Sequence, residues 1–432
     1  MMATNDSINL CSYNVKNYDP TKYNIIKELF DKCDFLLLQE TWLIESEFIR
    51  KFKNDFPSSA CISASKMDLD GIRVGRPYGG VSICYHSHLK CKVEYVATAS
   101  KSICALKVNF SDVNLMLINV YMPSSDKWDA LDEYTSILQE VSNICIKNST
   151  QHLILGGDWN ADNNRNDLRS RLFKEFISNE NLINCLELDI SNIPYTYENS
   201  RVTPSTFSTI DHFLISPNMS NVVDRFDTIF SYNDFSDHFP IMLSLNIKTE
   251  HFKIAKQEYK PCVAWHKCND ENIASYKYLI ENELLKINPQ HSGLKCRNFK
   301  CISHEKFIHN LYNEIISICC KASKECLPHT SANQGRKVIP GWNEHVKEHA
   351  KNSRIWHDTW VRYGKPRNGD IANMKRKTRL KYHYAVRFVN RENIKIRNCK
   401  MGEAISKNND RVLWDEVRKM SKTNQDLPNM MD

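Results

Sequence analysis

Polar side chains that could bind a metal ion or move a proton stand directly beside apolar runs of the sequence. If these runs are strands, and the last of them is antiparallel to the others, the polar side chains meet at one edge of a sheet. Six such placements in one chain favour a site on a rigid scaffold over ordinary loop residues. The residues are Asn14, Glu40, Tyr121 and Asp158, which each follow an apolar run, and Asp237 and His238, which precede one.

The metal-binding capacity of this set lies in its oxygen atoms. Glu40, Asp158 and Asp237 are carboxylates, and Asn14 and Asn160 add amide oxygens. Hard oxygen ligands suit Mg²⁺, with Mn²⁺ as a substitute, and no cysteine or second histidine in the set argues for zinc. The pattern therefore predicts a magnesium site and no organic cofactor.

The histidine adds acid–base chemistry to this set. His238 could contact a phosphate oxygen or protonate a leaving group. Asp211 lies in another apolar run, 210–215, and could hold the imidazole in one tautomer. Since the chain has no GxSxG, P-loop or GxGxxG motif, the residues favour phosphodiester hydrolysis over acyl transfer.

Residues 153–160, Leu-Ile-Leu-Gly-Gly-Asp-Trp-Asn, are the stretch around which the chain is organised. The aliphatic residues predict the end of a buried strand, and the two glycines permit a sharp turn close to a ligand. We expect Asp158 on a turn outside the core, where it could orient a water molecule. An ordinary turn is the alternative, because Gly, Asp and Asn are common turn formers.

Strands outnumber helices in the first 250 residues, and the two types alternate along the chain. This mixture favours two sheets packed face to face with helices outside them. Helices are expected at 23–30, 128–146 and 168–177. Strands are expected at 8–13, 35–38, 79–85, 91–97, 104–110, 115–120, 153–157, 195–197, 206–207, 210–215 and 239–245.

Composition places the chain among globular proteins with more than one module. The 432 residues carry a net charge of +7, with 23 basic and 32 acidic residues before position 251 and 35 basic and 19 acidic residues after it. The 16 cysteines are scattered, as is typical of reduced thiols inside cells. The sequence has neither a signal peptide nor a run of about 18 apolar residues, so we expect no membrane span and a nuclear location.

Six motifs, all in the same order as in the family, resemble the endonuclease/exonuclease/phosphatase superfamily. Among its members, residues 5–248 are most similar to the apurinic/apyrimidinic-type endonuclease of non-LTR retrotransposon polyproteins. The motifs are SYNV at 12–15, LQET at 38–41, NVYMP at 119–123, GGDWN at 156–160, TIDHFLIS at 209–216 and SDH at 236–238.

The resemblance implies a four-layer αββα sandwich, with two mostly antiparallel sheets flanked by helices, that cuts DNA phosphodiesters with Mg²⁺. Glu40 and Asn14 match the metal ligands, and Asp237 would support the metal or the histidine. Asp158 matches the residue that orients or deprotonates the attacking water. The remaining implied roles are phosphate contacts for Asn160 and Tyr121, and binding of the scissile phosphate by His238, held by Asp211.

Three residues are expected to contact DNA. Thr196 matches a family position near a DNA-reading hairpin, Ser236 precedes the Asp-His pair, and Arg201 lies in the polar loop 198–205. We expect this loop to set sequence preference by entering a groove. Lys16-Asn17 departs from the Asp/Asn-Gly pair that is common in repair enzymes, which argues against a repair assignment.

Residues 249–432 form a second region, basic and mainly helical, which resembles the connector that precedes a reverse transcriptase. It contains no Asp-Asp polymerase motif. Its densest basic stretch, 375–382, predicts a clamp on target DNA or on the element's RNA, and a merely solvated helix is the alternative. Its tryptophans are expected to pack rather than to stack on bases, and residues 1–248 alone are expected to nick DNA.

These observations predict a Mg²⁺-dependent DNA endonuclease of a non-LTR retrotransposon, which nicks target DNA and leaves a 3′-hydroxyl primer. The alternatives are an abasic-site repair endonuclease, a phosphatase of the same superfamily and a non-catalytic nucleic-acid-binding relic.

Overall fold

The computed structural model describes most of the chain. The described residues are 7–67, 77–110, 113–124, 128–148, 152–200, 202, 205–232, 234–247, 263–287, 301–329 and 342–424. They belong to two compact units, one formed by residues 1–252 together with 338–432, and the other by residues 253–337. The first unit contains all the candidate site residues.

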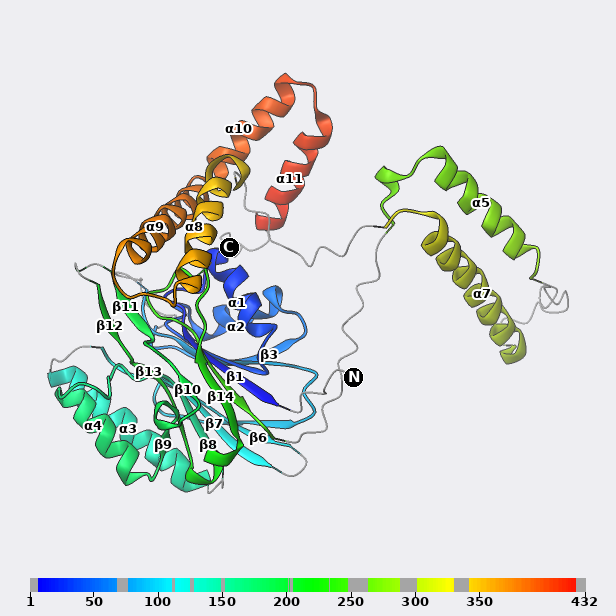
Figure 1. Ribbon diagram of the computed structural model, residues 1–432. Helices are drawn as coiled ribbons and strands as arrows, with labels where there is room; N and C mark the ends of the chain where they lie inside the picture. Colours follow the sequence, from blue (N-terminus) through cyan, green and yellow to red (C-terminus); the bar gives the residue numbers. More distant parts are fainter. Residues whose placement is uncertain are drawn as a thin grey trace, which may run out of the picture. The chain divides into compact units, whose positions relative to one another are not determined.

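Two mixed sheets form the centre of the first unit (Figure 1). Both are mostly antiparallel, but β1 pairs with β2, β10 with β14 and β7 with β8 in parallel. The first sheet has the order β10 (Ser191–Asn192), β14 (Val223–Thr228), β15 (Ile241–Leu245), β1 (Ile8–Asn14), β2 (Phe35–Gln39), β4 (Val81–His86), β3 (Ser59–Ala64). The second has the order β5 (Lys92–Val96), β6 (Ile103–Asn109), β7 (Asn114–Tyr121), β8 (His152–Asp158), β13 (Asp211–Ile215), β9 (Ile183–Asn184). A separate hairpin joins β11 (Tyr197–Asn199) to β12 (Thr206–Ser208).

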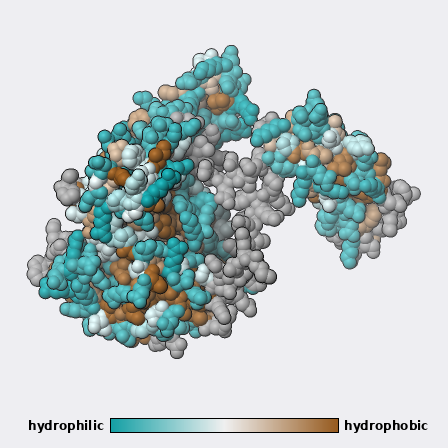
Figure 2. Space-filling view, in the orientation of Figure 1, coloured by the Kyte–Doolittle hydropathy of each residue, from teal (hydrophilic) through white to brown (hydrophobic). Residues whose placement is uncertain are grey.

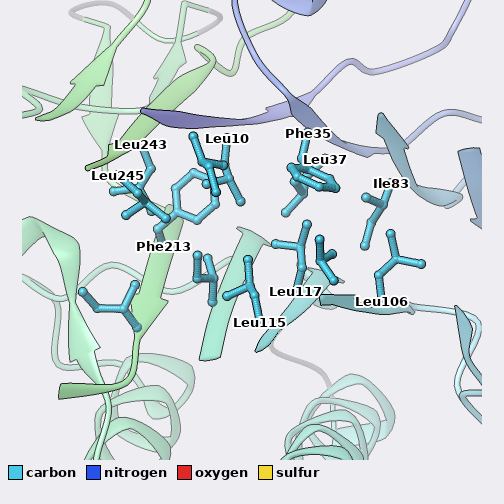
Figure 3. Close-up of a cluster of buried hydrophobic side chains, with 14 of the residues drawn as sticks. Leu10, Phe35, Leu37, Ile83, Leu106, Leu115, Leu117, Phe213, Leu243 and Leu245 are labelled. Atoms are coloured by element: carbon cyan, nitrogen blue, oxygen red, sulfur yellow. The ribbon is translucent and has the colours of Figure 1, made fainter. Parts of the chain in front are cut away.

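Successive side chains of a strand point to opposite faces of its sheet, and this explains why the sheets pack on each other and are covered by helices on their outer faces. In β2 the side chains of Phe35 and Leu37 point between the sheets, whereas Leu36 and Leu38 belong to the core beneath the helices. Figure 3 shows the inter-sheet core, with Phe35 and Leu37 among its leucines and phenylalanines. The helices α1 (Tyr23–Phe30) and α2 (Glu45–Asp55) cover the first sheet, and α3 (Trp128–Asn148) and α4 (Leu168–Asn179) cover the second. The expected four-layer arrangement is therefore confirmed.

Strand register brings the polar strand ends together. Asn14 pairs with Gln39, next to Glu40, in the parallel β1–β2 ladder. Asp158, at the end of β8, pairs with Tyr121 on one side and with Asp211 on the other. The antiparallel course of β13 places its first residue beside the last residue of β8, as the sequence predicts for one polar edge.

Two glycines let β8 approach its neighbours closely. Gly157 has φ +144°, and a Cβ atom there would collide with the carbonyl oxygen of Val120 in β7. A Cβ atom at Gly156 would lie 2.5 Å from the ring of Phe213 and 2.8 Å from Leu37 across the inter-sheet space. The glycines thus allow Asp158 to sit at the junction of three strands and two sheets.

The C-terminal part of the first unit is helical. It comprises a π-helical turn at Trp342–Val346, α8 (Lys347–Arg362), α9 (Asp370–Arg391), α10 (Asn393–Ser406) and α11 (Asp410–Asn424). Its small core contains Val346, Tyr382 and Val386, and Phe235, which lies between β14 and β15, packs against it. Hydrophilic residues make up most of the visible surface of the helices, with hydrophobic residues in small groups (Figure 2).

The second unit is a helical hairpin of α5 (Asp270–Leu284) and α7 (Ile302–Cys326). An Asn269 capping box begins α5, in which no described residue is buried. Within the described parts of the chain, no helix is long and apolar enough to cross a membrane. The described cysteines are free thiols.

Candidate active site

Asn14 links the carboxylates of Glu40 and Asp158. Its side-chain nitrogen donates to Oε1 of Glu40 at 2.9 Å and to Oδ2 of Asp158 at 2.8 Å. Asn14 and Asp158 are fully buried, whereas Glu40 is half-buried. One amide therefore holds acids from both sheets, separated by more than a hundred residues in sequence, at one point.

Glu40 is held in a strained conformation. Its φ is +50°, and Trp42, two residues on, has φ +55°, both in the left-handed region that non-glycine residues rarely adopt. The indole nitrogen of Trp42 donates to Oε2 of Glu40 at 3.1 Å. Asn160, on the opposite sheet, has φ +49° as well. Two motif residues of the site, Glu40 and Asn160, thus have backbone conformations that non-glycine residues rarely adopt.

Asp158 lies inside the protein, and the expectation of a turn outside the core is wrong. It is the last residue of β8 and is completely buried, because the β7 and β13 strands flank it on both sides. Its Oδ1 accepts from the backbone nitrogen of Asn160 at 3.0 Å, and the Asn160 amide group donates to the carbonyl of Met122. Burial raises the pKa of Asp158 to about 7, partly offset by His238.

His238 is oriented by Asp211. Its Nδ1 lies 3.0 Å from Oδ2 and 3.1 Å from Oδ1 of Asp211, and its Nε2 lies 3.9 Å from Oδ2 of Asp158. Burial alone would lower the pKa of His238, but the Asp211 and Asp158 carboxylates outweigh it and raise the pKa to about 9. The Asp211 and Asp158 carboxylates therefore favour the protonated imidazole, whose Nε2 is directed towards the carboxylate cluster.

The site fits a divalent cation. Among the described residues, one side-chain atom each from Glu40, Asp158 and His238 lies within 4.8 Å of the others. The two carboxylates are the groups that could bind the cation, because a protonated imidazole offers no lone pair to a metal. A cluster with two carboxylates and an amide neighbour, open on the half-buried Glu40 side, matches a cation that keeps several waters.

Tyr121 lies at the rim of this cluster. It is opposite Asp158 in the β7–β8 ladder, and its hydroxyl is hydrogen-bonded to Glu40. Burial and the charges of Glu40 and Asp158 raise the pKa of Tyr121 above its usual value. The phenol therefore stays protonated and can donate a hydrogen bond.

Asp237 has a different partner. Its Oδ2 lies 2.6 Å from Nζ of Lys16, both side chains are partly exposed, and Asp237 is not part of the Glu40–Asp158–His238 cluster. Burial acts to raise the pKa of Asp237, but Lys16 outweighs it and lowers the pKa. Lys16, which departs from the pattern common in repair enzymes, therefore forms an ion pair with Asp237, the acid that was expected to support the metal or the histidine.

Thr196 and Ser236 are buried and bonded within the protein. The Thr196 hydroxyl accepts from the backbone nitrogens of Ile210 and Asp211, each at 3.0 Å. The Ser236 hydroxyl donates to the carbonyl of Asn14 at 2.7 Å and accepts from the backbone nitrogen of His238. Both side chains hold the segments that carry Asp211 and His238, so they offer no free surface to DNA. Arg201 lies outside the described residues.

Sequence reasoning missed several residues that support the site. Trp42 directly follows the LQET motif, so an indole N–H donor two residues from Glu40 could have been noticed in the sequence. The buried amide pair Gln39–Asn119 could not, because its 2.7 Å hydrogen bond joins strands of different sheets. The partners of Glu198 and Asp234 in α9 were also missed, since they are more than 140 residues away.

Comparison with known proteins identifies the family to which this chain belongs. Residues 11–238 match the Endonuclease/Exonuclease/phosphatase family, and the chain belongs to this family. No curated protein matches.

Solved structures similar to this chain include several nucleases. One is the endonuclease domain of TRAS1, a telomere-specific non-LTR retrotransposon, at 15% identity, with 56% of this chain and 100% of that chain covered and a TM-score of 0.44. Others are the 3′–5′ exonuclease NExo from Neisseria meningitidis, at 17% identity and TM-score 0.43, and an AP endonuclease from Archaeoglobus fulgidus, at 15% identity and TM-score 0.44. Each of these two also covers 56% of this chain and 100% of its own.

Proposed function

We propose that the protein is a Mg²⁺-dependent DNA endonuclease of the non-LTR retrotransposon type, which nicks one strand and leaves a 3′-hydroxyl. The observation that carries the proposal is the junction of Glu40, Asn14 and Asp158 beside the His238–Asp211 pair. Family members are hydrolytic nucleases or phosphatases. The retrotransposon assignment rests on the six motifs and on the basic C-terminal region.

The residues divide the reaction among them. Glu40 and Asn14 would hold the cation, which supplies positive charge to the phosphate when bound. Asp158 would orient the attacking water and accept its proton, since a buried carboxylate with a raised pKa is a better base than an exposed one. We keep Asp237 as a support for His238 through its place in the SDH motif, with its charge balanced by Lys16.

The phosphate contacts come from donors at the rim. His238, cationic and held by Asp211, would bind a non-bridging oxygen of the scissile phosphate. Asn160 would donate to the same group through the amide hydrogen that Met122 does not bind, as negative charge grows in the transition state. Tyr121 would do so by exchanging its hydrogen bond to Glu40 for one to the phosphate. All of these groups are fixed by hydrogen bonds within the protein, which favours preorganised stabilisation of the transition state.

The outer face of α9 suits a nucleic acid. Lys377, Lys381 and Arg387 are exposed on it, together with Tyr384 and Phe388, which are 60% and 42% exposed. Positive side chains interleaved with aromatic rings bind phosphates and stack on bases. We propose that this face contacts target DNA or the element's RNA.

Charge reversal on this face should weaken DNA binding and reduce its dependence on salt. We expect Lys377→Glu, Lys381→Glu and Arg387→Glu together to reduce the slope of log affinity against log salt by about 3, because each neutralised phosphate contributes roughly 0.9 on duplex DNA. The measurement is fluorescence anisotropy of a labelled duplex from low to high salt. An unchanged slope would contradict the contact of this face with nucleic acid.

The substrate class can be tested on one preparation. The protein is incubated with supercoiled plasmid, with a duplex carrying one abasic site, and with an inositol phosphate, each with Mg²⁺. The proposal expects open-circular plasmid whose nicks are extended directly by a DNA polymerase, which requires a 3′-hydroxyl. Preferential cleavage at the abasic site would instead favour a repair enzyme, and release of phosphate alone would favour a phosphatase.

A further inference from the structure

We propose that helix α9 positions the catalytic histidine, with Arg379 as its main positioning residue. The inference concerns the site of the proposed function and rests on it. The segment 234–238, which carries His238, and the neighbouring hairpin strand β11 are both fastened by basic residues of α9. The helix thus acts as a brace for the site, in addition to the nucleic-acid contacts proposed for its outer face.

Arg379 binds the backbone of the histidine segment. Its Nε donates to the carbonyl of Asp234 at 2.8 Å, and its Nη2 donates to the carbonyl of Ser236 at 2.6 Å. A second link is the ion pair of the same guanidinium with the Asp234 carboxylate at 3.8 Å. A planar guanidinium with several donors can fix two carbonyls and a carboxylate at once, which a lysine cannot.

Asp234 and Ser236 pass this restraint to the site. The fully buried Asp234 carboxylate accepts from the Tyr13 hydroxyl at 2.6 Å and from the Ser236 backbone nitrogen at 2.9 Å. The Ser236 hydroxyl donates to the carbonyl of Asn14 and accepts from the backbone nitrogen of His238. Arg379 is therefore connected, through Ser236, to the backbone of both His238 and Asn14, the residues that carry the imidazole and the amide of the site.

The other side of the histidine is fastened through Glu198. This acid, 3% exposed, lies 3.6 Å from Nζ of the buried Lys375 and forms an ion pair with Arg376. Its backbone nitrogen donates to the carbonyl of Asp237 at 2.9 Å. The residue before it, Tyr197, forms a β-bridge with His238, and the two rings lie 4.9 Å apart.

Apolar contacts complete the brace. The ring of Phe235 stacks on His383 of α9 at 4.9 Å and contacts Tyr382 at 5.1 Å. Trp360 of α8 is buried against Phe230, which confirms the packing interpretation for this tryptophan.

Three cations of the basic stretch thus bind the protein itself, so the expected clamp on nucleic acid cannot include Lys375, Arg376 and Arg379.

The brace changes what we expect of a shortened protein. Without α9, the buried acids Glu198 and Asp234 lose their cationic partners, and the ring of Phe235 loses its cover. We therefore expect that residues 1–248 alone do not nick DNA, contrary to the expectation from the sequence. A point substitution in the full chain is the sharper test, because truncation could fail by misfolding.

The test compares Arg379→Gln with the wild type and with Arg362→Gln in the full chain. Arg362 is an exposed arginine at the end of α8, and its loss removes the same charge from the same helical part. With a plasmid substrate and Mg²⁺, we expect kcat of Arg379→Gln to fall about 10- to 100-fold, the range that misplacement of a reacting group by an ångström produces. KM should change less than about 3-fold, Arg379→Lys should recover part of kcat, and Arg362→Gln should match the wild type.

Amide hydrogen exchange tests the brace without any activity. Arg379→Gln should speed exchange at Ser236, His238 and Phe239, whose amides are donors in this network, while exchange in β8 stays unchanged. Unchanged exchange at 234–239, a loss seen only in KM, or equally faster exchange in β8 would each overturn the inference. If the wild type does not nick DNA, the proposed function fails, whereas the exchange result still decides whether α9 holds the histidine segment.

Discussion

Replacing Asp158 by asparagine should lower the rate of DNA nicking by about 10²- to 10⁴-fold, the usual contribution of a positioned general base. Asparagine keeps the shape of the side chain and one acceptor oxygen, so it can accept from the Asn14 amide or from the Asn160 backbone nitrogen, which bind different oxygens of Asp158. It removes the negative charge and the capacity to accept a proton from water. Because Asp158 is fully buried, alanine would leave a cavity and unpaired donors, so asparagine is the cleaner change.

Single-turnover nicking of supercoiled plasmid measures this effect. Asp224→Asn is the matched control, since Asp224 is an exposed acid of β14 in the same unit. Circular dichroism and a thermal melt establish that both variants are folded. A folded Asp158→Asn protein that nicks at a rate near that of the wild type would remove Asp158 from the mechanism.

Replacing Glu40 by glutamine should raise the Mg²⁺ concentration needed for half-maximal nicking by at least about 10-fold, because a carboxylate ligand is exchanged for a neutral amide. Asn14 can still donate to the remaining side-chain oxygen, so the link between the two sheets survives. Excess Mg²⁺ or Mn²⁺ should therefore restore much of the rate. This response differs from that of Asp158→Asn, which metal should not rescue.

Metal binding can be measured apart from catalysis, by electron paramagnetic resonance of Mn²⁺ titrated into the protein. Glu45→Gln serves as control, because Glu45 is an exposed acid five residues further along. Equal Mn²⁺ affinity of wild type and Glu40→Gln would contradict the role of Glu40 as a ligand. So would a Glu40→Gln rate that no metal concentration improves.

Local pattern was enough to predict the sheets and the edge where the site lies. Each apolar run ends at a polar residue, and strand direction alone decides which ends meet. Asn14, Glu40 and Asp158 were predicted in this way. The β1–β2 register places Asn14 beside Glu40, whereas the hydrogen bond from Asn14 to Asp158 depends on how the two sheets stack. The position of Asp158 was misjudged, because a glycine pair predicts a turn but not how many strands surround it.

Contacts between segments that are distant in the chain could not be predicted from the sequence. The basic stretch of α9 has cations around more than one face, and periodicity cannot say which of them meet acids elsewhere in the chain. Glu198 and Asp234 lie in segments that read as ordinary polar loops. Their burial against Lys375 and Arg379 depends on how the C-terminal helices fold back onto the sheets, which no local rule contains.

The central claim is that this junction of acids, amide and histidine hydrolyses DNA with a bound divalent cation. The most direct measurement is nicking of supercoiled plasmid by the full chain with Mg²⁺, with Mg²⁺ plus excess chelator, and with the Asp158→Asn variant under the first condition. The account predicts open-circular DNA in the first reaction and intact plasmid in the other two. Nicking that persists with chelator or with Asp158→Asn, or a wild-type protein that leaves the plasmid intact, would contradict it.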